Sequence, residues 1–342
     1  MNTAHPIEIV GGGLAGLSLG LALRRAGVPV TVLEAGRYPR HRVCGEFITG
    51  LAPATIARLG LAPFLADALH HREVAWFHRE TPTRIQRLPS PALGLSRHAL
   101  DARLAAAFVA AGGDLRTNTR ATDLAPQPGR VLTNGRRRGD ATWIGLKIHA
   151  RGLALTRDLE LHLGNQAYVG LSAIEGGEVN LCGLFRQRRL AGTNLALLLA
   201  YLEAAGLPAL AARLAAGASD PASFCAVAAL SFSAPPTPAP SDTISLGDAH
   251  GLIPPFTGNG MALAFQSAEA ALDPLLAYAR GETDWSATCH AVNRALHRRF
   301  RARFTAARAL HSFFLQPRRQ RCLTALARSR LLPLRPLYAL LH

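Results

Sequence analysis

Hydrophobic residues at the beginning of the chain form two short runs with a helical pattern between them. Residues 7–10 and 30–33 predict buried strands, and leucines at 14, 17 and 21 predict the helix that joins them. Gly11, Gly13 and Gly16 occupy the first turn in the spacing G-x-G-x-x-G, and Gly27 ends the helix. The pattern therefore predicts a strand–helix–strand unit that opens with a glycine-rich turn.

From residue 73 to residue 185 the pattern is mostly that of strands, interrupted by one clear helix. Ser96 is placed to cap that helix, and its apolar positions recur up to residue 111, before Gly112 and Gly113 end it. The predicted strands cover 73–78, 83–88, 114–117, 120–124, 131–132, 144–149, 158–163, 167–172 and 179–185. The close spacing of the last four predicts a sheet inserted beside the first unit.

The remainder of the chain is predominantly helical. Helices are predicted over 194–204, 208–215, 261–279, 285–315 and 322–341, and a strand over 243–246. The loop 254–260, rich in proline and glycine, joins that strand to the helix at 261. A second glycine loop thus lies between a strand and a helix, where backbone N–H groups can hold negative charge.

The order of the elements predicts an α/β fold in three parts. A discontinuous dinucleotide-binding domain is expected at 1–72, 95–142 and 241–282. A β-rich substrate domain is expected at 73–94 and 143–240, and a basic helical region at 283–342.

The first glycine turn has the chemistry of a dinucleotide site. Gly11 permits the tight turn, Gly13 lets the backbone approach a pyrophosphate, and Gly16 lets the helix lie close to the strand. Glu34 ends the second strand, where a carboxylate can accept hydrogen bonds from ribose hydroxyls. The same carboxylate would repel a 2′-phosphate, which argues against an NADP site.

Four segments resemble the FAD-dependent oxidoreductases of the p-hydroxybenzoate hydroxylase type, and within them the geranylgeranyl reductase branch. The first is the glycine turn, with seventeen residues between Gly16 and Glu34. The second is the loop 39–46, similar to the one that in the reductases places a cysteine near the isoalloxazine. The others are Arg97 with Asp101, and a group formed by Gly247, Asp248, Pro255 and the sequence Gly-Asn-Gly at 258–260.

This resemblance implies a Rossmann-type, GR2-like FAD-binding domain with an inserted mixed β-sheet domain and a helical C-terminal region. It implies FAD as cofactor. The electron donor stays open between NAD(P)H, for which the sequence has no dedicated fingerprint, and a ferredoxin. The residues implied to bind FAD are Gly11, Gly13, Leu14, Ala15, Gly16, Glu34, Ala35, Arg42, Val43, Cys44, Gly45, Arg97, Ala121, Gly247, Asp248, Gly258, Asn259, Gly260 and Met261.

Cys44 is the candidate catalytic residue, and two interpretations stay open for it. It is either a thiol that serves as donor or stabiliser beside the flavin, with a pKa lowered by the arginines of its loop, or a small residue that packs against the cofactor. Glu46 is expected to pair with a loop arginine rather than to act as an acid or base. His250, which follows the Asp248 turn, is a further candidate for an approach to the cofactor.

The other cysteines and histidines suggest no metal site. The five cysteines are scattered without a C-x-x-C pair or a His/Cys cluster, so neither structural zinc nor a disulfide framework is expected. Cys182, Cys225, Cys289 and Cys322 lie in apolar segments and are expected in the core. For His149 and His162, packing is favoured over a pocket role.

The positive charge is concentrated towards the C-terminus. The formal net charge is +16, and Lys147 is the sole lysine. Residues 285–342 contain twelve arginines and no acidic residue. Three interpretations stay open for this region: a solvated helical layer that closes the substrate side, a contact with anionic lipid, and a docking site for an acidic carrier protein. No nucleic-acid partner is expected, because no recognition motif accompanies the charge.

The sequence and the resemblance together predict an FAD-dependent oxidoreductase that reduces carbon–carbon double bonds of an apolar, lipid-like or polyketide-like substrate, which a carrier could bear. The alternatives are a monooxygenase that hydroxylates an aromatic or polyketide, and a flavin-bound scaffold or membrane-associated protein without catalysis. A core strand begins at residue 7 and no apolar run reaches the roughly 18 residues of a membrane span. A cytoplasmic protein is expected, with membrane association as an open alternative.

Overall fold

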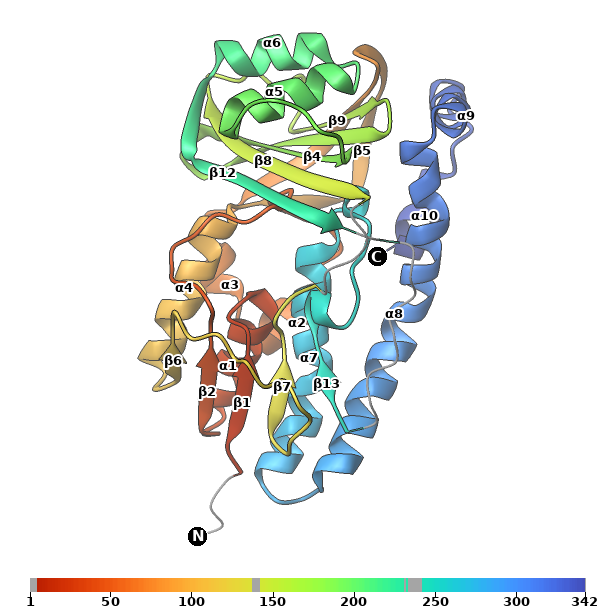
Figure 1. The fold of residues 1–342 in the computed structure, drawn as a ribbon. Helices are drawn as coiled ribbons and strands as arrows, with labels where there is room; N and C mark the ends of the chain where they lie inside the picture. Colours follow the sequence, from red (N-terminus) through yellow and green to blue (C-terminus); the bar gives the residue numbers. More distant parts are fainter. Residues whose placement is uncertain (1–4, 137–141, 231, 233–241, 342) are drawn as a thin grey trace.

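The computed structural model describes residues 5–136, 142–230, 232 and 242–341. A five-stranded sheet forms one end of the molecule (Figure 1). Its strands, in spatial order, are β13 (Ile244–Ser245), β7 (Arg130–Leu132), β1 (Ile7–Val10), β2 (Val30–Leu33) and β6 (Asp114–Arg116). All four pairings are parallel, so the carboxyl ends of β1, β2 and β13 meet at one edge of the sheet, as in other nucleotide-binding α/β folds.

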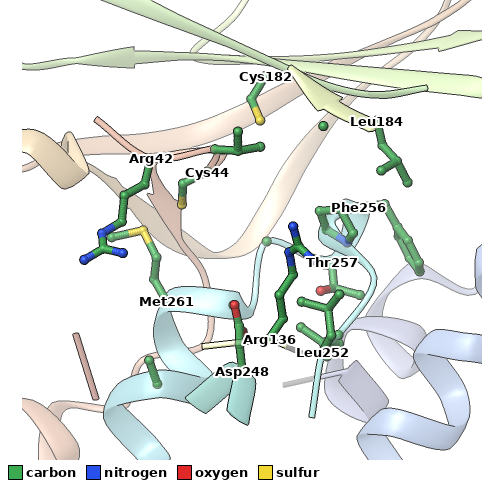
Figure 2. A pocket seen from close by; sticks show the side chains of 18 of the residues that line it. Arg42, Cys44, Arg136, Cys182, Leu184, Asp248, Leu252, Phe256, Thr257 and Met261 are labelled. Atoms are coloured by element: carbon green, nitrogen blue, oxygen red, sulfur yellow. The ribbon is translucent and has the colours of Figure 1, made fainter. Parts of the chain in front are cut away.

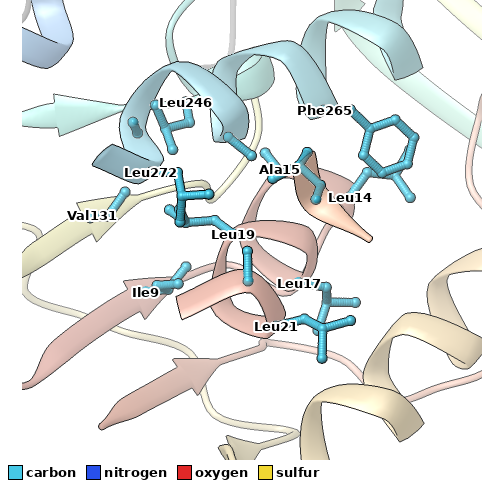
Figure 3. Close-up of a cluster of buried hydrophobic side chains, with 14 of the residues drawn as sticks. Ile9, Leu14, Ala15, Leu17, Leu19, Leu21, Val131, Leu246, Phe265 and Leu272 are labelled. Carbon is cyan, nitrogen blue, oxygen red and sulfur yellow. The ribbon is translucent and has the colours of Figure 1, made fainter. Parts of the chain in front are cut away.

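Helices cover this sheet because packing against it removes their apolar faces from water. α1 (Leu14–Arg25) lies between the strands and α7 (Gly260–Ala279), and its leucines pack with Ile9 and Phe265 in one core (Figure 3). α4 (Arg97–Ala110) packs beside α1, and Ser96 caps it by accepting a hydrogen bond from the Ala99 N–H, as predicted. Two short helices, α2 (Pro53–Leu59) and α3 (Ala62–Leu65), complete this part.

An eight-stranded mixed sheet forms the other end of the molecule. Its strands, in spatial order, are β12 (Ala218–Leu230), β8 (Trp143–Arg151), β11 (Glu178–Arg186), β10 (Ala167–Ile174), β9 (Leu159–Gly164), β4 (Leu69–His78), β5 (Thr81–Gly94) and β3 (Phe47–Ile48). Only the β4–β9 pairing is parallel among the described strands of this sheet. α5 (Asn194–Ala204) and α6 (Pro208–Ala216) cover its outer face and bury a second core.

Three helices form a column along one side of both sheets (Figure 1). They are α8 (Trp285–Leu315), α9 (Pro317–Arg328) and α10 (Leu334–Leu341). Short 3₁₀ turns lie at Glu175–Gly177, Gly247–Ala249 and Pro255–Thr257. Within the described part of the chain, no helix combines the length and the apolar character that crossing a bilayer requires.

The predicted fold class is confirmed, and two predicted elements are wrong. Residues 120–124 form an irregular loop instead of a strand, and they pair with none of the described strands. The helix expected to begin at 322 begins at Pro317, since proline fits the first turn of a helix. The domain boundaries stay a prediction, and the parts of them at 1–4, 137–141, 231, 233–241 and 342 lie outside the described residues.

Candidate FAD site

The first glycine turn brings bare backbone to the edge of the parallel sheet. Gly11 has a φ of +113°, and a Cβ there would lie 2.4 Å from the Thr133 carbonyl oxygen, so no side chain fits. Gly13 is the N-cap of α1, with no capping side chain and no acidic residue in the first turn, and the space around it is open. The N-terminal amides of α1 are therefore free to bind an anion that enters this space.

Gly16 has a packing role. A Cβ there would lie 2.1 Å from the Gly11 carbonyl oxygen and 2.6 Å from Thr133 Oγ1. The absence of a side chain lets α1 lie directly against β1, which fixes the position of the turn. Gly16 is fully enclosed and does not line the cavity that the turn faces.

Glu34 ends β2 beside the glycine turn and is almost completely buried. Its Oε2 accepts a hydrogen bond from the Gly12 N–H at 2.9 Å, and its Oε1 accepts one from the Gly36 N–H at 2.8 Å. Arg40 forms an ion pair with it at 3.0 Å. These contacts fix the carboxylate at the edge of the cavity, together with the neighbouring Ala35.

Three charged side chains connect the loop 39–46 to α4. The fully buried Asp101 accepts two hydrogen bonds from Arg97, at 2.7 and 2.8 Å, and one from Arg42 Nε at 2.9 Å. Burial disfavours the charge on Arg97, but the Asp101 carboxylate outweighs it and raises the pKa of the guanidinium. Arg42 Nη2 is buried and forms no hydrogen bond with the described residues, and its ionic neighbour is Glu34 Oε2 at 3.6 Å. It can therefore still donate a hydrogen bond to an anionic ligand.

The second glycine loop approaches the same space from the opposite side. Gly258 has a φ of +68°, and Gly260 begins α7 with open space around it. Asp248 follows β13, and its side chain faces the cavity (Figure 2). Displacement of bulk water raises the pKa of this carboxyl, although the charge of Arg97 acts against the shift. Asn259 anchors the loop from behind, since its buried Nδ2 donates to the Leu341 carbonyl oxygen.

The two glycine loops and most of these charged residues line one cavity of about 1130 Å³. Of the nineteen residues predicted to bind FAD, all except Gly16 and Asn259 line it, and these two support the loops from behind. Pockets for a single small ligand measure about 300–1,000 Å³, so this cavity has room for more than one ligand. Two uncapped helix N-termini, an orphaned arginine donor and a carboxylate facing the space fit a dinucleotide whose two ends need different partners.

A family model described as an FAD binding domain matches residues 4–142. Residues 4–142 are an FAD-binding domain. FAD is therefore the cofactor, as predicted, and this chain has the fold of the FAD-dependent oxidoreductases of the p-hydroxybenzoate hydroxylase type. The residues that hold FAD stay a prediction, which the shape of the cavity supports.

Relatives of the FAD-binding domain include proteins of different activities. The menaquinone reductase of Mycolicibacterium smegmatis is 30% identical over 128 residues, a stretch that covers 36% of this chain and 31% of that protein. The p-nitrophenol 4-monooxygenase PnpA of Pseudomonas putida has 15% identity and a TM-score of 0.75, with 100% of this chain and 97% of that chain covered. A geranylgeranyl bacteriochlorophyll reductase-like protein of Thermoplasma acidophilum has 17% identity and a TM-score of 0.72, with coverages of 94% and 91%.

Cys44 lines the cavity, but its predicted activation by arginines is wrong. Burial raises the pKa of the Cys44 thiol above its ordinary value, and the charge of Arg97 does not overcome this effect. The loop arginines are already neutralised by Glu34 and Asp101. The thiol is thus protonated at neutral pH, which favours a proton donor or a packing residue over a nucleophile.

The other cysteines are distributed differently from the prediction. Cys182 and Cys225 line the cavity instead of lying in the core, and Cys322 is exposed. The reason is their register, because Cys182 and Cys225 both pair with Lys147 of β8 and so share one face of the sheet. Cys289 is buried, as predicted.

The raised pKa makes a prediction about alkylation. In the FAD-free protein at pH 8, iodoacetamide should modify the exposed Cys322 at least about tenfold faster than Cys44, because a neutral thiol is a poor nucleophile. The Cys44 rate should keep rising with pH above 9, as more of the thiol ionises. Peptide mapping by mass spectrometry after timed quenching measures both rates. Preferential modification of Cys44 at pH 7 would contradict this assignment.

Glu46 belongs to a buried network that the sequence prediction missed. Its carboxylate lies 3.4 Å from Lys147 Nζ and 2.5 Å from His149 Nε2, and it accepts a hydrogen bond from the Arg97 N–H at 3.0 Å. The predicted arginine side chain is not among these partners. Burial alone would raise the pKa of Glu46, but the hydrogen bond from His149 and the charge of Lys147 lower it overall.

Three histidines were weighed as candidates, and none lines the cavity. His149 is occupied by Glu46, and His162 stacks on Phe77 with a centroid distance of 4.4 Å. His250 lies beside Phe300 and Phe304. By contrast His41, which the prediction passed over, lines the cavity and lies 3.1 Å from Lys147 Nζ, and burial lowers its pKa to about 4.

The half of the cavity away from the dinucleotide turn is apolar. It is lined by side chains from the mixed sheet, the C-terminal helices and the second glycine loop: Trp76, Tyr168, Leu184, Phe314, Leu323 and Phe256. Figure 2 shows Leu184 and Phe256 beside this space. The sequence shows the apolar positions but not which of them share a wall, because the strands and helices that carry them are far apart along the chain.

Proposed function

We propose that this protein is an FAD-dependent reductase of carbon–carbon double bonds in a long apolar, lipid-like substrate. The observation that carries the proposal is the apolar half of the cavity, which continues directly from the predicted flavin site. An apolar pocket binds such a chain by removing its surface from water, at about 25 cal/mol per Å². The names of the menaquinone reductases and of the reductase-like structure support the same class of reaction.

The chemistry of this reaction balances with few protein groups. FAD, once reduced by an external donor such as NAD(P)H, supplies a hydride to one carbon. The other carbon takes a proton, and the π bond is replaced by two C–H bonds. The residues of this chain must hold the alkene, exclude water and place an acid. Cys44 Sγ holds a proton at neutral pH in the cavity wall, and Tyr168 is a second neutral acid, since burial raises its pKa.

The second glycine loop would assist by stabilising negative charge. The amides at the N-terminus of α7 face the cavity without a capping side chain. Donors fixed in this way stabilise an anion without reorganising when it forms. The Cys44 thiol is neutral, so it adds no second negative charge that would repel this anion.

Anaerobic reduction of the purified holoprotein tests this proposal. The reduced enzyme is mixed either with a polyprenyl quinone in detergent or with oxygen, while the flavin spectrum is followed and the product is analysed by mass spectrometry. We expect the polyprenyl chain to gain two hydrogens that remain after the quinone ring is reoxidised, and no oxygen atom. Leu184→Arg should abolish turnover and retain FAD, because it places a charge in the apolar wall, whereas Leu190→Arg, on the partly buried loop after β11, should leave turnover unchanged.

A different outcome would identify the competing activity. Oxygen uptake that depends on substrate, with one oxygen atom added to the product, would make the protein a monooxygenase, the activity named for PnpA. A flavin that reacts with neither would indicate a scaffold. Either result would overturn the reductase proposal.

A further inference from the structure

The outer surface of α9 and α10 carries arginines without carboxylates. Residues 318–335 contain six arginines, at 318, 319, 321, 328, 330 and 335, and all are exposed. No ion pair between any of them and an acidic residue is found among the described residues. Arg79 and Arg84, from the neighbouring β4–β5 hairpin, add to the same positive field. Arg84 donates a hydrogen bond to the Ala327 carbonyl oxygen. Burial lowers the pKa of His78, and the charges of Arg79 and Arg328 lower it further.

Large apolar side chains project from this same surface. Leu331, between the two helices, is 71% exposed, and Leu340 of α10 is 48% exposed. If these helices were only a solvated layer, polar residues would be expected at the positions of Leu331 and Leu340. A docking site for an acidic carrier protein would explain the arginines but not the exposed leucines. Arginines interspersed with exposed leucines on short amphipathic helices are typical of a surface that lies in a membrane interface.

The inner surface of these helices lines the apolar half of the cavity. Leu323 of α9 and Leu337 and Leu341 of α10 all face it, as does Leu332 from the connection between the helices. α10 therefore carries both cavity-lining leucines and the exposed Leu340, and the connection carries both Leu332 and the exposed Leu331. The column formed by α8, α9 and α10 stands along one side of the molecule (Figure 1).

We infer that α9 and α10 dock on the surface of an anionic bilayer and present the cavity to the acyl layer. The arginines attract the negative headgroups, and Leu331 and Leu340 enter the interface between headgroups and acyl chains. A substrate dissolved in the bilayer then reaches the cavity between the two helices without crossing water. The docking stands without the proposed reductase function, and only the route of the substrate rests on it.

Flotation with vesicles tests the docking without any turnover. The holoprotein is mixed with phosphatidylcholine vesicles that contain either no anionic lipid or 30% phosphatidylglycerol. We expect binding only to the anionic vesicles, weakened at 1 M salt, where the Debye length is about 3 Å. Arg321→Glu/Arg328→Glu/Arg335→Glu should lower the partition coefficient at least about 100-fold, since each arginine near the surface contributes about fivefold.

Matched variants separate this surface from general basicity. Arg294→Glu/Arg298→Glu reverses the charge of two exposed arginines in the N-terminal half of α8. This variant should retain most of the binding. Leu331→Ser/Leu340→Ser keeps every charge and should still lose about tenfold or more. A fluorophore on the exposed Cys322 should shift its emission to the blue with anionic vesicles. Equal loss in the α8 control, or no binding by the wild type, would overturn the inference.

The route of the substrate has its own readout. With substrate in vesicles, the triple arginine variant should lose turnover, but with substrate in detergent it should match the wild type. If the wild type binds vesicles and consumes no substrate in either form, the proposed function fails and the docking holds. Equal turnover of the variant with vesicles and detergent would overturn the route.

Discussion

Gly16→Ala is expected to yield a protein that binds FAD at least about 100-fold more weakly than the wild type. The added Cβ would lie 2.1 Å from the Gly11 carbonyl oxygen, a backbone atom that cannot rotate away. α1 must therefore move off β1, and the amides at its N-terminus leave the position that fits the diphosphate. The factor corresponds to about 2.7 kcal/mol of binding free energy. Titration of the deflavinated protein with FAD, followed by flavin fluorescence, measures it.

Gly20→Ala is the matched control on the same helix. A Cβ at Gly20 would lie 3.0 Å from Phe108 Cε2 and 3.5 Å from Ile9 Cδ1, which are side-chain atoms that can shift. Alanine also favours a helix interior over glycine by about 1 kcal/mol. This variant should bind FAD like the wild type. Equal FAD affinity in both variants would show that α1 tolerates a Cβ at Gly16 and that the close approach is not required.

Lys147→Met is expected to lower the free energy of unfolding at pH 7 by about 3–5 kcal/mol. Lys147 and Glu46 are both completely enclosed, and methionine fills similar space without the charge. The Glu46 carboxylate would then be buried with only His149 and a backbone N–H as partners. Urea denaturation of the holoprotein, followed by intrinsic fluorescence, measures the midpoint and the slope.

The pH dependence and a double variant test the cause of this loss. In the wild type the pKa of Glu46 is lowered, so its stabilisation is present above about pH 5 and is lost as the pH falls through the folded-state pKa. Without Lys147, burial is no longer offset in full and the pKa of Glu46 should rise. The penalty should therefore shrink below about pH 5. Glu46→Gln/Lys147→Met should recover at least half of it, and a penalty that is independent of both pH and Glu46 would implicate packing instead.

The parallel sheet and both glycine loops could be predicted because each is encoded locally. The strand, the glycine spacing and the following helix lie within a few residues of each other, and backbone sterics at Gly11 and Gly16 allow few alternatives. The same holds for the helix capped by Ser96. In these segments the local sequence pattern and the tertiary contacts favour the same structure, so the sequence alone was sufficient to predict these elements.

The Glu46 network could not be predicted because its members are about a hundred residues apart. A loop rich in arginine suggested an arginine partner for Glu46, but β8 places Lys147 and His149 there instead. α5 and α6 cover one face of β8 and the loop 39–46 covers the other, so the strand is buried along almost its whole length. Its apolar residues alternate with Lys147 and His149, a pattern that predicts a solvated polar face rather than a buried one. The one available signal was the presence of a single lysine, inside a strand, in a chain that otherwise uses arginine.

The wall formed by the C-terminal helices was out of reach for a related reason. The apolar positions of 285–341 indicate amphipathic helices, but both the inward and the outward face of α9 and α10 carry leucines. Which leucine lines the cavity depends on the path of the chain after Pro317 and on how α10 packs against α8. Only the three-dimensional arrangement assigns Leu337 and Leu341 to the inside and Leu340 to the outside.

The hydrogen bond from Asn259 to the Leu341 carbonyl oxygen joins the second glycine loop to the end of α10. Deleting α10 would remove the hydrogen-bond acceptor of the buried Asn259 side-chain amide and would lower the free energy of unfolding by about 1–3 kcal/mol. A truncation meant to open the apolar half of the cavity would therefore also loosen the second glycine loop. Loss of activity in a shortened form could then come from the opened cavity wall or from the loosened loop. Point substitutions in α10 separate these two effects.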